Sequence, residues 1–549
     1  MAWLPTMRWY GGKSRPIASV AVEEVLWFEG GPPEAALVVL DVVSGNPRLD
    51  FPSEHDRYAA VVAFVVDPEG RPLLGTLPGA PPWHAIEATP DAGSVAALLR
   101  GLATGSTVQG LRGGEIVYAD AADGVRQLLA KGAAALPIAP MGSEQSNTSV
   151  RVGCAHVFKL FRRLEAGEHP QLEVGRFLTR VGFRSAAPLE GSLSYRSGTG
   201  QVHALGTLEG WITSSGDGWT YVTSQLRRRD RAVHHQAIAE QVYGLGETTA
   251  AFHLALASDA TTPAFAPEPV TEADVSAWLA GLDQQADRTR GLVERLHHEW
   301  TDRDATTARG FLEVLRDSLP RLGAGRHGLD LDFHKIRIHG DYHLGQTLKA
   351  VDGFALIDFE GEPSKPLAER RLKQSALKDV AGMLRSLDYA WATASAPETS
   401  RDPEVLGALA EARAAFLDGY LARARRDSAT FLPAPDDLPR WTALFELEKA
   451  LYEVEYEVNH RPAWVGIPLG ASGETATGLA ARMTAWRHDD DWRNVATRTG
   501  DTSQILIPAG IRSSPLSGSA IALRGPQGGT PVCPSPSMVH TSRSLRQGR

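Results

Sequence analysis

One segment, residues 336–363, constrains the fold most, because it places many polar groups between two apolar runs: IRIHGDYHLGQTLKAVDGFALIDFEGEP. Its pattern predicts a strand (IRI), a polar loop (HGDYHLGQ), a second strand (TLKAV) and a third strand (FALID). An Asp-Gly pair, Asp352-Gly353, separates the last two strands and favours a tight hairpin. The hairpin should bring Asp341 and Asp358 together at one end of a small sheet, in positions fixed by the flanking apolar residues.

Length and composition limit the classes of protein that remain. A chain of 549 residues predicts several structural units rather than one small core. The net charge of −9 argues against general binding to nucleic acid or to membrane surfaces, and the apolar runs are too short to span a membrane. Two cysteines make neither a disulfide scaffold nor a four-cysteine zinc site. We therefore expect a cytoplasmic protein.

The order of the elements predicts an α+β protein with five parts. A β-rich cap should be followed by a short helical bridge, a β-rich N-lobe, a helical C-lobe and a tail that is rich in Ser, Gly, Pro and Arg and should be disordered. The expected ranges are 1–90 (cap), 91–135 (bridge), 136–213 (N-lobe), 214–490 (C-lobe) and 491–549 (tail).

The polar groups of the opening segment suit phosphoryl transfer from ATP. That reaction needs a carboxylate for the acceptor hydroxyl and oxygen ligands for Mg²⁺ on the phosphates. In protein kinases these groups are an Asp, an amide five residues later and a second Asp on the next hairpin. Here Asp341 is followed by Gln346 and then by Asp358, and Glu360 would complete or orient the metal site. We expect His339 to orient the loop, and His343 either to touch substrate or to cap the loop.

A kinase also needs a lysine on the nucleotide side with an acidic partner. Lys159 lies inside the strand-like run AHVFKLF, where a lysine is costly unless it is paired. The helix that should begin near residue 170 offers Glu173, so we expect a Lys159–Glu173 pair that binds the phosphates of ATP. The run before the strand would cover the phosphates or form an ordinary hairpin turn, and it contains Ser146, Asn147, Thr148 and Ser149.

These motifs together resemble the aminoglycoside-phosphotransferase-like branch of the kinase fold, and most closely the actinobacterial maltokinases. The resemblance rests on RWYGGKSR, GSEQSNTS, FKLFRR, HGDYHLGQ, IDFEGEPSKPLAERR, KDVAGMLRSLDYA and ELEKALYEVEYEVNHRPAWVGIPL. It implies a bilobal protein-kinase-like fold with an N-terminal cap, and transfer from ATP to maltose to give maltose 1-phosphate for glycogen-type α-glucan synthesis. It also adds trehalose synthase as a candidate partner.

The late helix is the expected acceptor site. Glu448, Tyr452 and Tyr456 recur at i, i+4 and i+8 on one face, and Lys449 flanks them. Aromatic faces with charged neighbours suit a sugar, whereas the same tyrosines could simply pack against the lobe.

Three further residues should support the site rather than react. We expect Arg370 and Arg371 to hold the loop after the metal ligand, and Asp379 to brace the catalytic loop.

Two other functions stay open. One is a kinase for another small acceptor, glucosamine or an aminoglycoside. The other is a catalytically inactive, kinase-like scaffold that binds trehalose synthase.

Overall fold

The structure is a computed structural model that describes residues 3–470 apart from short gaps. The gaps are residues 14, 29–34, 47–50, 72, 78–80, 90, 131–136, 142–146, 229–230, 297, 299, 326–330 and 396–401. The predictions made for Ser146 and for the tail, residues 491–549, therefore lie outside the described residues.

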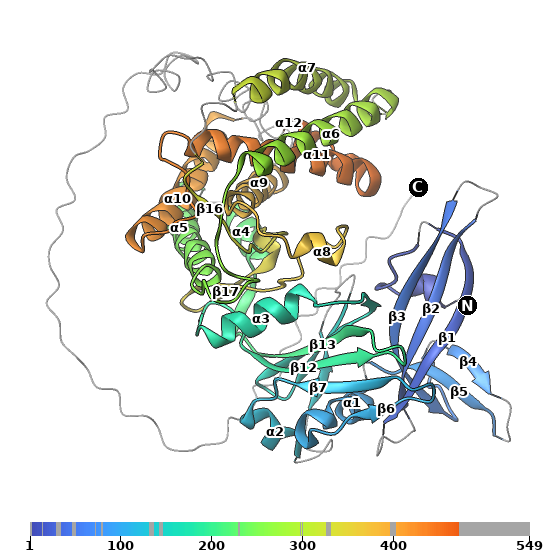
Figure 1. Cartoon of the computed structure of the whole chain (residues 1–549). Helices are drawn as coiled ribbons and strands as arrows, with labels where there is room; N and C mark the ends of the chain where they lie inside the picture. Colours follow the sequence, from blue (N-terminus) through green and yellow to red (C-terminus); the bar gives the residue numbers. More distant parts are fainter. Residues whose placement is uncertain are drawn as a thin grey trace, which may run out of the picture. The chain divides into compact units, whose positions relative to one another are not determined.

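The cap is one antiparallel sheet (Figure 1), and each of its two faces packs against a separate hydrophobic core. Its strands, in spatial order, are β1 (Ile17–Phe28), β2 (Ala35–Asn46), β3 (Phe51–Val65), β5 (Trp83–Glu87) and β4 (Leu73–Leu77). Side chains alternate along a strand, so Leu37 and Val39 of β2 face one core while Leu40 and Val42 face another. The N-terminal segment covers the second face with Trp9, which accounts for the aromatic motif near the start of the chain.

The N-lobe is a seven-stranded sheet that shares its hydrophobic core with the cap. In spatial order its strands are β6 (Val108–Gln109), β7 (Glu115–Ala119), β12 (Leu189–Arg196), β13 (Val202–Gly210), β10 (His156–Phe161), β9 (Asn147–Val152) and β8 (Ile138–Pro140). Three helices accompany it: α1 (Ala92–Thr104), α2 (Asp123–Ala130) and α3 (Pro170–Arg180). Segment 91–135 therefore differs from the purely helical bridge that we expected, because β6 and β7 add two strands to the edge of the sheet. Runs as short as Val108–Gln109 carry too little alternation to be recognised in the sequence.

The junction between cap and N-lobe is made of backbone pairing and one buried cation. A short strand, β11 (Arg163–Leu164), leaves the N-lobe and pairs with β3 of the cap. The residue before it, Arg162, is 1% exposed and donates to Thr148 of β9 at 2.8 Å. Further hydrogen bonds of Arg162 reach Glu87 (3.0 Å) and Thr89 (2.7 Å) in the cap. Because an unpaired buried guanidinium is costly, these contacts tie the cap to β9 of the N-lobe.

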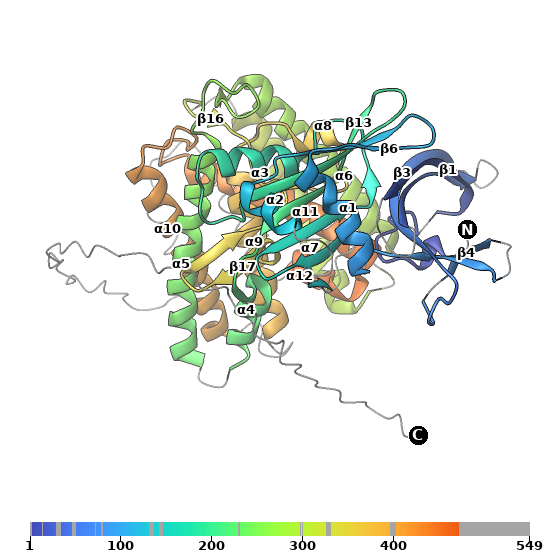
Figure 2. The same ribbon diagram turned by 90° about the horizontal axis from the view of Figure 1, so that it is seen from below.

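The C-lobe is helical around a second core and carries a small sheet. Its helices are α4 (Gly218–Leu226), α5 (Arg231–Leu256), α6 (Glu272–Leu296), α7 (Asp302–Gly325), α8 (Leu367–Arg370), α9 (Leu377–Ala394), α10 (Pro403–Arg426), α11 (Leu438–His460) and α12 (Gly466–Gly470). The small sheet consists of β14 (Ser214–Asp217), β17 (Thr347–Ala350) and β18 (Gly353–Leu356), and a separate pair is formed by β15 (Glu268–Pro269) and β16 (His334–Lys335). Figure 1 shows the C-lobe helices gathered apart from the seven-stranded sheet, and Figure 2 gives the view of the same elements from below.

The predicted hairpin is confirmed, but its turn residues are Val351 and Asp352 rather than Asp352 and Gly353, because Ala350 pairs with Gly353, which begins β18 with a φ of 127°. The predicted strand IRI is wrong, because β16 ends at Lys335 and Ile336 forms only an isolated bridge with Gln374. The fold class predicted from the sequence, a bilobal kinase-like α+β fold with a β-rich cap, is confirmed.

Candidate active site

The loop that carries Asp341 is held by a buried carboxylate. Asp379, in the first turn of α9, accepts hydrogen bonds from the backbone N–H groups of His339 (2.7 Å) and Gly340 (2.9 Å). It also accepts from Nε2 of His253 at 3.0 Å. Desolvation raises the pKa of Asp379, but these donors outweigh it, so the pKa lies below its ordinary value. The expectation that Asp379 braces the loop is confirmed.

Two further contacts fix the same loop. His339 donates from Nε2 to the carbonyl of Ile357 at 3.0 Å, which joins the Asp341 loop to the strand that leads to Asp358 and confirms the orienting role. Helix α9 approaches so closely that a Cβ on Gly382 would lie 2.6 Å from the carbonyl oxygen of Tyr342. The KDVAGM motif therefore needs a glycine for close packing.

Gln346, Asp358 and Glu360 meet at the end of the hairpin. Gln346 donates from Nε2 to Oδ2 of Asp358 at 3.1 Å, which leaves its amide oxygen as a further donor atom for a cation. Asp358 has a φ of 68°, a left-handed conformation that residues other than glycine rarely adopt and that is typical of functional positions. Two carboxylates and an amide oxygen fit a hard, oxygen-preferring cation such as Mg²⁺. No group of three or more His, Cys, Asp or Glu side chains suited to a metal occurs among the described residues.

Lys159 contacts this cluster from the N-lobe. Its Nζ lies 2.5 Å from Oδ1 of Asp358 and 2.7 Å from Oε1 of Glu360. Desolvation raises the pKa of Asp358, but the charge and hydrogen bond of Lys159 lower it to about 2. Lys159, Asp358 and Glu360 therefore form one charged unit across the two lobes.

The predicted Lys159–Glu173 pair is wrong. Glu173 instead binds Arg337 (2.7 Å) and, in a bidentate pair, Arg371 (2.7 and 3.0 Å). The physical reason is that two guanidinium groups of the C-lobe match both oxygens of Glu173, whereas Lys159 finds two carboxylates on the hairpin. Nothing in the sequence indicated these other partners, since order and spacing fit the kinase pair.

The run before β10 is only partly directed at the site. Asn147 donates to Oε1 of Glu360 at 2.6 Å and so contacts the group formed by Lys159, Asp358 and Glu360. Thr148 instead accepts from the buried Arg162, and Ser149 is buried opposite Lys159 in the β9–β10 register. The side chains of this run thus serve packing as well as the site.

A group of charged and aromatic residues from α11 and the loop after Glu360 lies beside Asp341. Lys449 places its Nζ 3.6 Å from Asp341 and 3.9 Å from Glu362. Tyr452 donates to Glu362 at 2.8 Å, and the ammonium of Lys449 lies 4.7 Å from the ring centre of Tyr452. Burial alone would lower the pKa of Lys449, but Asp341 and Glu362 raise it above its ordinary value.

The other predicted acceptor residues lie as follows. Glu448 forms an ion pair with Lys378 of α9 at 2.8 Å, so Lys449, rather than Glu448, lies next to Asp341. Tyr456 is 36% exposed and its ring stacks on that of His460. His343 accepts from the N–H of Gly345 at 3.0 Å and thus caps the loop, while its Nε2 lies 4.0 Å from Asp341.

Glu362 and a buried network of charged residues under α11 were not predicted from the sequence. Glu362 links Lys449 to Tyr452, and it lies in the EGEP motif that carries part of the family resemblance. Arg385 lies 2.8 Å from Glu453 and 2.9 Å from Asp388, and so forms a buried network under α11. The sequence signal for this network was the presence of charged residues at helix positions that should face the core.

Family models and curated relatives match long stretches of the chain. A model of the phosphotransferase enzyme family matches residues 137–361, and a model of the maltokinase N-terminal cap domain matches residues 3–91. A glucosamine kinase of Streptacidiphilus jiangxiensis is 31% identical over 337 residues, which cover 59% of this chain and 70% of that protein. A glucosamine kinase of Mycolicibacterium smegmatis is 28% identical over 60% of this chain and 77% of its own length.

Solved structures agree on the fold. One glucosamine kinase crystal form aligns over 85% of this chain and 95% of its own, with 24% identity and a TM-score of 0.57. A glucosamine kinase bound to glucosamine, ADP and inorganic phosphate aligns with a TM-score of 0.55 and 24% identity, over 82% of this chain and 92% of its own.

The described helices include none that is both long and apolar enough to cross a membrane. The two family matches and the curated relatives support a sugar kinase. The chain belongs to the phosphotransferase enzyme family, in the branch that carries a maltokinase N-terminal cap domain.

Proposed function

We propose that the protein transfers the γ-phosphoryl group of ATP to the anomeric hydroxyl of maltose and releases maltose 1-phosphate and ADP. The observation that carries this proposal is the position of Asp341, whose carboxylate lies next to Lys449 while its loop is tied through His339 to the strand of Asp358. One carboxylate for the hydroxyl and one for the metal are the groups that phosphoryl transfer requires.

The nucleotide side consists of Lys159, Gln346, Asp358 and Glu360. Gln346, Asp358 and Glu360 would hold Mg²⁺, which neutralises charge on the β- and γ-phosphates when it is bound. Lys159 already contacts both carboxylates, so its ammonium is placed to contact a phosphate beside them. The backbone of the run that contains Asn147 would lie over the phosphates.

The acceptor side supplies the base. Asp341 takes the proton of the sugar hydroxyl while the oxygen of that hydroxyl forms a bond to the γ-phosphorus. The bond between the γ-phosphorus and the bridging oxygen breaks, and ADP is released. Lys449 lies beside Asp341 and offers a donor to the sugar, and Tyr452 with Glu362 forms the next part of the surface. Tyr456 and His343 would extend the contacts with the sugar.

The charges on this surface favour a neutral sugar. An ammonium group on the acceptor would meet Lys449, which already balances Asp341 and Glu362. Glucosamine is the second candidate, because the curated relatives that match over most of their own length are glucosamine kinases. With maltose as the acceptor, the enzyme would work in the cytoplasm, feed glycogen-type α-glucan synthesis and be supplied by trehalose synthase.

Product identification tests the proposal. ADP release is measured with maltose, glucosamine and kanamycin in turn, and each phosphorylated product is identified by mass spectrometry and ³¹P NMR. We expect maltose to give the highest kcat/KM, with phosphate on the anomeric oxygen. A higher kcat/KM for glucosamine would replace maltose with the second candidate. Lack of ADP release with every sugar, together with stable binding of trehalose synthase, would favour the inactive scaffold.

A retained rate in a folded Asp341→Asn variant would contradict the assignment of the base. Full activity after exhaustive removal of divalent cations would contradict the metal site.

A further inference from the structure

Two consecutive arginines of the C-lobe reach two glutamates of the N-lobe. Arg370 and Arg371 end the short helix α8, which follows the segment that carries Glu360 and Glu362. Arg370 forms an ion pair with Glu165, just after β11, and Arg371 forms the bidentate pair with Glu173 of α3. We call these four residues the inter-lobe clamp.

The Glu173 half of the clamp is strongly held. Arg337 adds a third hydrogen bond at 2.7 Å, and its side chain is only 2% exposed. Desolvation raises the pKa of Glu173, but the hydrogen bond from Arg371 and the charge of Arg337 outweigh it and lower that pKa below its ordinary value. Loss of Glu173 would leave Arg337 as a buried charge without this partner, so the contact is costly to break.

The Arg370 half connects the clamp to the metal site. Arg370 donates to the backbone carbonyl of Glu360 at 3.4 Å, and the chain turns around its side chain at Gly361, which has a φ of 71°. A Cβ on Gly361 would lie 3.3 Å from Cβ of Arg370. The side chain of Glu360 is the one that contacts Lys159 and Asn147. Movement of Arg370 would therefore move a residue of the metal cluster.

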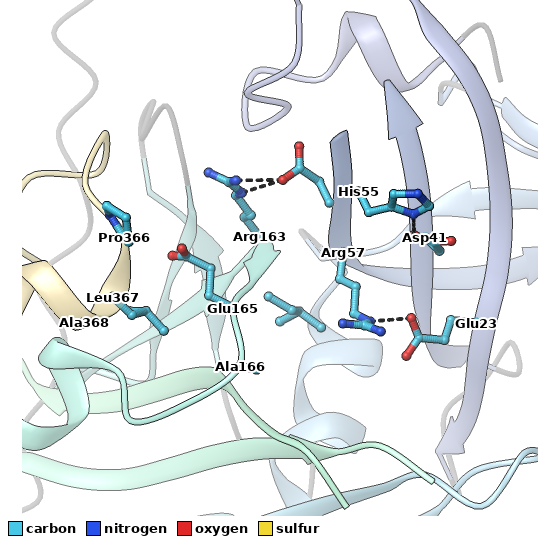
Figure 3. A pocket seen from close by; sticks show the side chains of 12 residues that line it. Glu23, Asp41, His55, Arg57, Arg163, Glu165, Ala166, Pro366, Leu367 and Ala368 are labelled. Carbon is cyan, nitrogen blue, oxygen red and sulfur yellow. Dashed lines mark hydrogen bonds and ion pairs between the residues drawn. The ribbon is translucent and has the colours of Figure 1, made fainter. Parts of the chain in front are cut away.

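The segment that leads from Glu362 into α8 faces the cap across a polar cavity of about 650 Å³ (Figure 3). Pro366 and Leu367 line one side with Glu165, and cap residues, among them His55 and Arg57, line the other. Because open space lies on this side, packing against the cap cannot hold the segment in place. The two arginines instead tie it to the N-lobe.

We propose that the inter-lobe clamp positions Glu360 and Glu362, so that Glu165, Glu173, Arg370 and Arg371 act as positioning residues for the metal cluster and the acceptor surface together. Glu173 belongs to the clamp rather than to the lysine–glutamate pair that the sequence suggested. One segment then sets the geometry of both substrates, because Glu360 contacts Lys159 while Glu362 contacts Tyr452 and Lys449.

The test compares Arg371→Gln, Arg371→Lys and Glu173→Gln with the unchanged full-length protein. The matched control is Arg176→Gln, on the same helix as Glu173, whose ion pairs with Asp120 and Glu168 stay within the N-lobe. The measurements are kcat, the KM values for ATP, Mg²⁺ and sugar, the binding of Mg·ATP by calorimetry, and thermal unfolding.

We expect Arg371→Gln to lower kcat by about 10- to 100-fold, the loss that follows a misplacement of about 1 Å at a reacting centre. The KM values for Mg²⁺ and sugar should both rise, Arg371→Lys should recover part of the rate, and Arg176→Gln should match the unchanged protein. Glu173→Gln combined with Arg371→Gln should cost less than the sum of the two single changes, because they share one contact.

Some results would overturn the proposal. If Arg371→Gln and Glu173→Gln lower the unfolding temperature but keep kcat and every KM, the clamp only stabilises the fold. A rise in the KM for one substrate alone would also contradict the shared role. The inference rests on the proposed kinase activity, but calorimetric binding of Mg·ATP needs no acceptor. It therefore still tests the clamp if no sugar is phosphorylated.

Discussion

The brace under the catalytic loop makes a sharp prediction for Asp379→Asn. The two carboxylate oxygens accept from different backbone N–H groups, Oδ2 from His339 and Oδ1 from Gly340. An asparagine has one oxygen and one NH₂ group, so in either orientation the NH₂ faces a backbone N–H. His253 can change its tautomer to suit the amide, but the backbone donors cannot.

The cost can be worked out from these contacts. Each hydrogen bond to a charged acceptor contributes about 1.5–3 kcal/mol, and a buried donor left without a partner costs about 1–3 kcal/mol. Asp379 is only 2% exposed, so water does not replace the lost acceptor. We expect Asp379→Asn to lower the free energy of unfolding by about 2–4 kcal/mol, which a protein of ordinary stability survives.

The assay measures both stability and rate. Urea unfolding followed by tryptophan fluorescence gives the stability, and ADP release with saturating ATP and sugar gives kcat at 25 °C. We expect kcat to fall by about 10²-fold with little change in either KM, because the loop that places Asp341 loosens. Asp427→Asn, at an exposed ion pair with Arg423, serves as the control. An Asp379→Asn protein within about 0.5 kcal/mol of the unchanged one, with full kcat, would refute the bracing argument.

Three further predictions follow from the site. Lys159→Met should lower kcat by about 10²-fold or more, since it removes the cation that contacts both Asp358 and Glu360, and tighter Mg·ATP binding by calorimetry would contradict this role. Tyr452→Phe removes the donor to Glu362, so the KM for sugar should rise by about 5- to 10-fold while the KM for ATP stays unchanged in the same assay. The folded state depresses the pKa of Asp358 from 3.8 to about 2, so its stabilisation is fully present above about pH 4 and is lost as the pH falls toward 2. Urea unfolding at pH 6, 4 and 3 should show this decline, and an equal free energy at all three would contradict it.

The sequence predicted the parts of the site that are local in the chain. Gln346 and Asp358 flank a single hairpin, so spacing alone placed them together. The cap and lobe order also followed from patterns within each segment, because alternation and helical periodicity are local signals.

The missed contacts are those between segments far apart in the chain. Glu173 lies 198 residues from Arg371, and nothing in the spacing distinguishes this partner from Lys159. The sequence predicted the helix α11 but not its exact rotation about its own axis. A difference of one position in that rotation determines whether Glu448 or Lys449 lies beside Asp341. Such choices depend on which charges meet in the folded core, and that is set by tertiary packing.

Arg162 limits how this protein could be recombined with its relatives. The cap holds that guanidinium through Glu87 and Thr89, while the N-lobe holds it through Thr148. A cap exchanged without its Glu and Thr would leave a buried positive charge without these partners, and a kinase domain expressed without its cap would expose the hydrophobic core that the two share. The cap-domain match ends at residue 91, but the chain cannot be divided there into two independent parts. A functional chimera must exchange both sides of the Arg162 contact together.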